Sequence, residues 1–287
     1  MTATRNCHNR IAVVFDFDMT LAPDSYDALL RHCGVADTGR WRRERIAPLV
    51  EDGWDEVLAR GYQLVRLSRS GEGPRITREL MAEVGRVLRP FDGVPEMFGR
   101  VRRQARETLP GLEVEFYLLS AGFLDTVRAT AIAGEFEALW GCEMHFGEDG
   151  AVDFVRAAIT HPEKAHYILQ LAKGTGVRGP NEPANVHRPV PDEDMHVPFD
   201  QIVYVGDGAS DMPVFDLLNS RGGFAIAVTK SEAARDWGGD GDIRPGRRVE
   251  NVASADFREG SELLRSLLLA VESIAKRVAL RRLSVGE

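Results

Sequence analysis

Two aspartates and a threonine close the first apolar segment of the chain, in the stretch Asp16-Phe17-Asp18-Met19-Thr20. Residues 11–18 are mostly apolar, β-branched or aromatic, which is typical of a buried parallel strand. A turn directly after the strand would expose both carboxylates at its carboxyl end. A buried carboxylate is costly unless a cation or hydrogen bonds compensate its charge, so the pair predicts a functional site rather than a plain turn.

A second pair of carboxylates, Asp207 and Asp211, follows the apolar residues 202–205. The glycines at positions 206 and 208 permit a tight turn. In open α/β sheets the carboxyl ends of the strands lie at one edge, where active sites form. Carboxylates gathered there need a hard cation, and oxygen ligands suit Mg²⁺. The sequence therefore predicts a magnesium site, and it does not distinguish Mg²⁺ from Mn²⁺.

Ser120, Ala121 and Gly122 follow a third apolar segment, residues 113–119. A hydroxyl and free backbone N–H groups at a strand-to-helix turn can cradle an oxyanion or a phosphate. Many α/β turns carry the same residue types for structural reasons, so this motif alone is a weak signal.

Lys164 is one of only four lysines, the other basic residues being arginines. Thr160 and Glu163 fit a capping box, which puts Lys164 in or just after the first turn of a helix. A cation there opposes the helix dipole, and a nearby phosphate would make the placement favourable. A solvated surface lysine is the alternative interpretation.

The elements that must position these residues alternate between strand and helix. We expect strands at residues 11–18, 113–119, 201–205 and 224–228, a hairpin over 142–159 and helices from about residues 95, 124 and 160. This alternation predicts an α/β fold with a doubly wound parallel sheet. Residues 259–283 form a long amphipathic pattern, which favours a helix packed on the core over a dimer contact.

Residues 24–90 show helical spacing without strands. Asp24 can cap a helix that ends near Gly34, and Thr77 can cap another. Helices are also expected over 40–50 and 54–69. We therefore predict an all-helical cap domain at residues 23–92, inserted into a core of residues 1–22 plus 93–287.

Bulk properties exclude several classes of protein. The net charge of −8 disfavours nonspecific nucleic-acid binding, and no apolar run approaches the roughly 20 residues that span a bilayer. The polar start lacks a secretory signal, so a cytoplasmic location is expected. Cys7, Cys33 and Cys142 are too scattered for a disulfide framework or a metal site.

The irregular stretch 174–200 contains several side chains that can bind metals. A solvated loop is favoured over a metal site, because their spacing fits no known ligand pattern. These residues are His187, Asp192, Glu193, Asp194 and His196.

Taken in order, the four motifs resemble those of the haloacid dehalogenase (HAD) superfamily, in its phosphatase branch. They are Asp16-x-Asp18-x-Thr20, Ser120, Lys164 and Gly206-Asp-Gly-x-x-Asp211. The resemblance covers nearly the whole chain and implies a Rossmann-like core with a C1-type helical cap. It is greatest to the phosphoserine-phosphatase-like group.

The resemblance implies roles for the carboxylates. Asp16 would be the nucleophile, and Asp18 the acid that protonates the leaving oxygen and then the base for water. Mg²⁺ would be held by the carboxylates of Asp16 and Asp207 and by the backbone carbonyl of Asp18. Asp211 would support the metal or hold Lys164 in place.

The resemblance also implies a set of phosphate-binding groups: Thr20, Ser120, Ala121, Gly122 and Lys164. The second aspartate of the first motif argues against a dehalogenase, since halide leaves without a proton. P-type ATPases share the nucleophile but need membrane helices.

The expected substrate is a small phosphorylated metabolite, because a cap would exclude bulky molecules. Ser25 stands where phosphoserine phosphatases typically carry a substrate-contacting glutamate, so phosphoserine is not singled out. One or two cap arginines could bind a second anionic group, although most are expected to be solvated: Arg31, Arg40, Arg42, Arg43, Arg45, Arg60, Arg66 and Arg69.

Two other functions use the same scaffold. A phosphotransferase or phosphomutase would exclude water and pass the phosphoryl group to another hydroxyl. A non-catalytic binding or regulatory protein is disfavoured by the intact set of acidic residues and Lys164.

Overall fold

The computed structural model describes residues 9–175, 186, 188–229 and 249–285. Its centre is a seven-stranded sheet with the order β4-β3-β2-β1-β5-β6-β7. All neighbouring strands are parallel except β3 and β4, which form an antiparallel hairpin. The strands are β1 (Arg10–Phe15), β2 (Glu113–Phe123), β3 (Ala138–Phe146), β4 (Val152–Ala157), β5 (Ile202–Gly206), β6 (Phe224–Thr229) and β7 (Asn251–Ser254).

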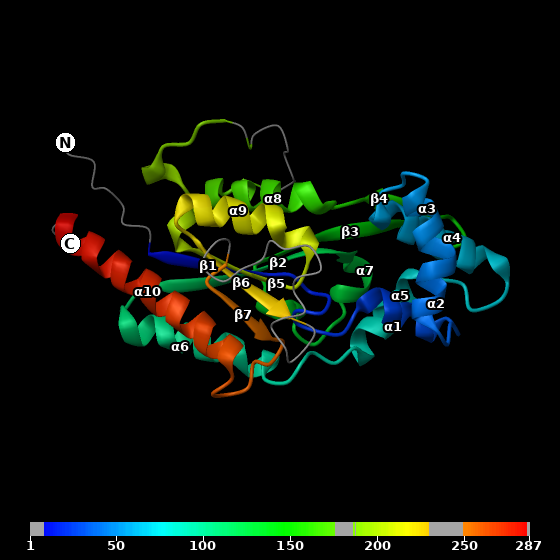
Figure 1. Ribbon diagram of the computed structural model, residues 1–287, viewed down its shortest axis with the longest axis horizontal. Coiled ribbons are helices and arrows are strands. Elements are labelled where there is room, and N and C mark those ends of the chain that lie inside the picture. The colour runs from blue at the N-terminus through cyan, green and yellow to red at the C-terminus, as the bar shows by residue number, and fades with distance from the viewer. Residues whose placement is uncertain (1–8, 176–185, 187, 230–248, 286–287) are drawn as a thin grey trace.

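Helices cover both faces of this sheet, as the predicted doubly wound fold requires (Figure 1). Helices α8 (His161–Lys173) and α9 (Met212–Arg221) lie on one face, and α6 (Val94–Thr108) and α10 (Glu262–Val285) on the other. The central strand β1 is buried on both sides, which explains its continuous apolar run. Its side chains alternate between two hydrophobic clusters, with Val14 in one and Val13 in the other.

Short helices fill the chain between β1 and α6 and form one end of the molecule (Figure 1). Both predicted caps are confirmed: Asp24 accepts from the Asp27 N–H at 2.8 Å, and Thr77 Oγ1 accepts from the Leu80 N–H at 3.2 Å. Residues 40–50 are not one helix, because a π-helical turn interrupts them at Arg42–Ile46. The helices are α1 (Ser25–His32), α2 (Thr38–Trp41), α3 (Ala47–Glu51), α4 (Glu56–Ser70) and α5 (Arg78–Val87).

The β3–β4 hairpin and the short helix α7 (Leu124–Val127) contact these helices. The Val152 N–H donates to the Ile76 carbonyl at 2.8 Å. Arg78 of α5 pairs with the buried carboxylate of Asp125 of α7 at 2.8 Å. The helical segment is therefore anchored to the core at points far from its two covalent connections.

Helix α10 packs its apolar side against the core but leaves Leu269, Leu280 and Leu283 exposed.

Strand β7 was not predicted from the sequence. Cys33 and Cys142 are free and buried, while Cys7 lies outside the described residues. Among the described helices, none is both long and apolar enough to cross a membrane.

The stretch 174–200 is only partly described, and His187 lies outside the described part. Glu193 and Asp194 belong to an exposed turn of 3-10 helix. His196 instead reaches the sheet, where its Nε2 lies 2.9 Å from a carboxylate oxygen of Glu115. Within the described residues, these side chains do not form a metal-binding cluster.

Candidate active site

The first motif forms a tight turn at the carboxyl end of β1. The Asp16 N–H still donates to the Val205 carbonyl of β5 at 2.9 Å, and the Leu21 N–H closes the turn on the Phe17 carbonyl at 2.9 Å. Met19, with φ of 60°, is a non-glycine residue in the left-handed region. Such backbone conformations are uncommon and cluster at functional sites.

Three carboxylates converge there from two strand ends. Oxygen atoms of Asp16, Asp207 and Asp211 all lie within 4.8 Å of one another. Burial, with the negative charges of Asp211, Asp207 and Asp18, raises the pKa of Asp16 to about 8, although Lys164 opposes the shift. A divalent cation would relieve the same repulsion, and the donors are the hard oxygens that Mg²⁺ prefers. The residues present therefore fit the metal that the sequence predicted.

Lys164 lies directly behind the nucleophile candidate and is fully buried. Its Nζ is 3.0 Å from Asp16 Oδ2 and 2.6 Å from Asp211 Oδ1. Burial alone would lower the pKa of Lys164, but Asp16 and Asp211 outweigh it and raise the pKa above its ordinary value. The predicted placement in the first turn of α8 is confirmed, with Glu163 accepting from the Thr160 N–H at 2.7 Å. The surface-lysine alternative is wrong.

Asp18 faces the end of β2, where Ser120 and Gly122 lie. A Cβ atom on Gly122 would sit only 2.5 Å from Asp18 Oδ2, so glycine at this position leaves room for the carboxylate where it now lies. The Ser25 N–H holds the other oxygen, Oδ1, at 2.7 Å. Burial and the charge of Asp24 raise the pKa of Asp18 to about 6, although hydrogen bonds from Ser25 act to lower it.

Two other predicted phosphate-binding residues differ in their surroundings. The Ser120 hydroxyl is buried and accepts from the Gly122 N–H at 3.0 Å. Thr20 is fully buried, and its Oγ1 has no hydrogen-bond partner among the described residues. Thr20 does not line the cavity described next.

A cavity of about 260 Å³ opens above these groups. Residues of the core and of the inserted helices share its wall. From the core come residues of the predicted motifs, together with Met19, His161, Gly208 and Ser210; from the helical segment come Asp24, Glu56, Val57 and Arg60. A second cavity, of about 620 Å³ between α4 and the β3–β4 hairpin, contains none of the motif residues.

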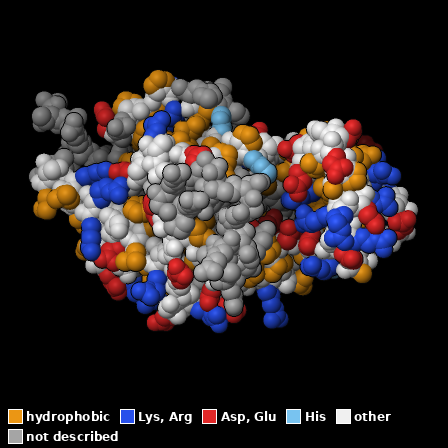
Figure 2. Space-filling model, in the orientation of Figure 1, with side chains coloured by type: hydrophobic (Ala, Val, Ile, Leu, Met, Phe, Trp, Pro, Cys, Tyr) orange, Lys and Arg blue, Asp and Glu red, His pale blue; other side chains and the backbone are white. Residues whose placement is uncertain are grey.

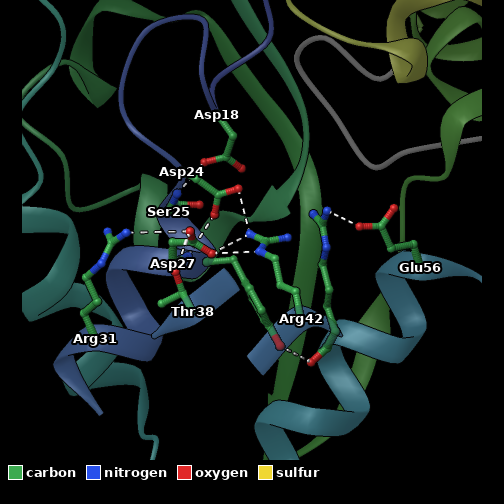
Figure 3. Close-up of polar contacts among 10 residues, drawn as sticks. Asp18, Asp24, Ser25, Asp27, Arg31, Thr38, Arg42 and Glu56 are labelled. Atoms are coloured by element: carbon green, nitrogen blue, oxygen red, sulfur yellow. Dashed lines mark hydrogen bonds and ion pairs between the residues drawn. The ribbon is translucent and has the colours of Figure 1, made fainter. Parts of the chain in front are cut away.

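The inserted helices hold a polar network beside the site (Figure 3). Arg42 reaches between two carboxylates, with 2.8 Å from Nη2 to Asp24 Oδ2 and 2.8 Å from Nε to Asp27 Oδ1. The guanidinium groups of Arg42 and Arg60 lie 5.1 Å and 5.8 Å from the Tyr26 ring centroid. Arg60 also pairs with Glu56.

The structure separates Arg60 from the other arginines of the helical segment. It alone of the eight named above lines the 260 Å³ cavity. Basic and acidic side chains are interspersed over the helical end of the molecule (Figure 2), as expected for solvated residues. No sequence signal marked Asp24, Glu56, Val57 or His161 as cavity residues, because each belongs to an ordinary cap or helical pattern. Ser210 lies within the fourth motif, at a position where the motif specifies no residue type.

Comparison with solved structures finds the same fold. A HAD family hydrolase from Salmonella enterica serovar Typhi superimposes with a TM-score of 0.58 at 14% identity, over 91% of this chain and 70% of that one. A phospho-aspartyl intermediate analogue of phosphoserine phosphatase has a TM-score of 0.55 at 16% identity, over 91% and 98%. A probable phosphoserine phosphatase from Vibrio cholerae gives 0.58 at 14% identity, over 96% and 68%.

At the level of sequence, the chain is 24% identical to an uncharacterized protein of Borreliella burgdorferi over 283 residues, covering 89% of this chain and 94% of that protein. No family model matches the chain. The fold is therefore that of HAD hydrolases and phosphoserine phosphatases, as predicted from the motifs.

Proposed function

We propose that this chain is a Mg²⁺-dependent phosphatase that hydrolyses a small phosphomonoester through an aspartyl-phosphate on Asp16. The observation that carries the proposal is the position of Asp16 between a buried ammonium group and a cluster of carboxylates, at the base of a cavity. Phosphoryl transfer needs cations that stabilise charge on the phosphoryl oxygens and a positioned nucleophile. This site has both kinds of group.

The reaction has two steps. A carboxylate oxygen of Asp16 attacks phosphorus, the ester P–O bond breaks, and the proton of Asp18 passes to the leaving alkoxide. Water then attacks the phosphorus of the aspartyl-phosphate and gives a proton to Asp18. The bond between phosphorus and Asp16 breaks, so phosphate is released and the Asp16 carboxylate is restored. Asp18 can serve both steps because the Ser25 N–H holds it beside the cavity and Gly122, which has no side chain, leaves it space there.

The remaining residues bind and orient the phosphoryl group. Lys164 would stabilise its charge from behind Asp16, and the Ser120 hydroxyl and the Ala121 N–H would bind its oxygens. The Gly122 N–H would join them on leaving the Ser120 hydroxyl, to which it donates at 3.0 Å. When bound, Mg²⁺ would supply a second positive charge for the phosphoryl oxygens, held by the carboxylates of Asp16 and Asp207 and the Asp18 carbonyl.

The substrate is a small molecule, because the cavity of about 260 Å³ is partly closed by helical residues. We assign residues 23–92 as a cap domain over a core of residues 1–22 and 93–287. Asp24, Glu56 and Arg60 would face the alcohol portion of the substrate.

The test is phosphate release from a panel of small phosphomonoesters, with Mg²⁺ and with EDTA. Wild type should release phosphate only with metal, and Asp16→Asn should release none. Asp256 pairs with Arg258 outside the cavity, so Asp256→Asn should behave as wild type. With an ester whose leaving group needs no proton, such as p-nitrophenyl phosphate, Asp18→Asn should accumulate phosphoprotein, detectable by mass spectrometry.

Two results would contradict the proposal. One is a folded, metal-loaded wild type that consumes none of the esters, and the other is full activity of Asp16→Asn. Consumption of ester without free phosphate would instead identify a phosphotransferase that uses the same nucleophile.

A further inference from the structure

Tyr204 is a residue next to the site that no motif includes. It lies in the middle of β5, is fully buried, and packs its ring edge-on against Phe215 at 5.9 Å between centroids. Its hydroxyl donates to Asp211 Oδ1 at 2.6 Å. A polar group deep in an apolar strand is costly unless it is bonded, so this contact needs an explanation beyond packing.

Within the described part of the chain, Asp211 receives three donors, which together fix its orientation. The Tyr204 hydroxyl and Lys164 Nζ share Oδ1, each at 2.6 Å, and the Gly208 N–H donates to Oδ2 at 3.0 Å. Lys164 Nζ also lies 3.4 Å from the Tyr204 oxygen. Asp211 is fully buried, so each of these donors offsets the cost of removing its charge from bulk water.

We propose that Tyr204 is a positioning residue: its hydroxyl fixes the carboxylate of Asp211, and through it holds the ammonium of Lys164 against Asp16. The inference rests on the proposed function, in which Lys164 stabilises the phosphoryl group. Without the hydroxyl, Lys164 is the sole donor to Asp211 Oδ1 among the residues that the structure describes. The ammonium then moves toward Asp211 and away from Asp16, where charge develops during transfer.

The variant Tyr204→Phe tests this, because it removes the hydroxyl and keeps the ring. Tyr117→Phe is a matched control. Tyr117 is equally buried and lies on β2, where it pairs with Val14 of β1 from the side opposite Tyr204. Its hydroxyl donates to Glu115 at 2.5 Å, away from the cavity. We expect kcat of Tyr204→Phe to fall about tenfold or more, as when other groups that orient an active-site residue are removed. Tyr117→Phe should keep wild-type kcat.

Inhibition by orthovanadate and by inorganic phosphate separates positioning from a general loss of structure. Vanadate resembles the transition state, so its affinity should fall with kcat in Tyr204→Phe. Affinity for phosphate should change less than vanadate affinity. Equal losses in both tyrosine variants, or unchanged kcat and vanadate affinity in Tyr204→Phe, would overturn the inference.

Crystal structures of wild type and Tyr204→Phe decide the inference without reference to activity. Lys164 Nζ should be displaced from Asp16 Oδ2 in the variant, and an unchanged position would overturn it. If wild type hydrolyses no ester, the proposed function fails, and this structural comparison still shows whether Tyr204 positions Lys164.

Discussion

The carboxylate of Asp18 accepts a hydrogen bond from a backbone N–H on one side, and on the other side a glycine leaves it space. Its carboxyl is surrounded by groups with opposite effects on its proton affinity: burial and Asp24 raise the pKa, while Ser25 and Arg60 lower it, and the result is about 6. A general acid works best with a pKa near the working pH. The environment of this one residue therefore predicts how activity depends on pH.

In the proposed mechanism Asp18 is protonated in the first step, so kcat/KM should fall as the pH rises through about 6. An ordinary aspartate would already have lost its proton well below that pH. Replacing Asp24 by Asn removes a charge that raises the pKa, so this fall should move to lower pH. A pH–rate profile at saturating Mg²⁺ measures the shift.

Asp27→Asn is the control for that profile, since Asp27 shares Arg42 with Asp24 but does not line the cavity. Its profile should match that of wild type. An Asp24→Asn profile that also matched wild type would show that Asp24 does not control the proton of Asp18.

Arg60 predicts a difference between substrates. As the arginine in the cavity wall, it can bind a second anionic group on the substrate. Arg60→Ala should then raise KM about tenfold or more for phosphomonoesters that carry a carboxylate, and little for uncharged ones. Steady-state kinetics on matched ester pairs measures this, with Arg45→Ala as control because Arg45 lies over the Trp41 ring. Equal effects on both esters would exclude such a subsite.

At the scale of elements, the inserted helices are seated on the core by close packing. Helix α5 approaches α7 at Gly85, where a Cβ atom would lie 2.1 Å from the Thr126 carbonyl oxygen. Helix α4 approaches β4 in the same way, with Gly61 against Val155. Backbone cannot yield as the end of a flexible side chain can, so the α5 contact tolerates no added atom.

Gly85→Ala should therefore destabilise the protein by about 1–3 kcal/mol, the usual cost of overpacking. Gly99→Ala is the matched control, since Gly99 lies in helix α6 with nothing within 4 Å of an added Cβ. That change should stabilise by up to about 1 kcal/mol through helix propensity. Urea unfolding monitored by circular dichroism measures the free energy of unfolding of both variants. A Gly85→Ala protein as stable as Gly99→Ala would contradict the close contact between α5 and α7.

The elements that sequence reasoning found are those with local signals. Apolar runs marked β1 and β5, and capping side chains marked the starts of α1 and α5. The π-helical turn at Arg42–Ile46 carries no such signal, and the four-residue strand β7 is too short to show a period. Likewise, the contact between Tyr204 and Asp211 and the position of Arg60 in the cavity wall depend on tertiary packing. Spacing along the chain does not predict such packing.

For the whole molecule, the fold brings acidic residues from separate strand ends into one buried cluster. Lys164 compensates only part of the negative charge, so without a divalent cation the cluster opposes folding once its protons are lost. The pKa of Asp16 is raised to about 8 in the folded state, compared with the ordinary value of 3.8. The stability associated with its proton is present below about pH 4 and disappears as the pH rises through about 8.

Mg²⁺ binding should replace that proton, so the metal should stabilise the protein more at pH 8 than at pH 5. At 100 times Kd, binding contributes about 2.7 kcal/mol, which corresponds to a rise in Tm of about 5 °C for a chain of this size. Differential scanning fluorimetry with Mg²⁺ and with EDTA measures the rise at both pH values. Asp207→Asn should abolish the rise by removing a proposed metal ligand, whereas Asp153→Asn on the hairpin should leave it unchanged. A rise that is equal at both pH values, or that survives Asp207→Asn, would mean that the metal binds elsewhere than at this cluster.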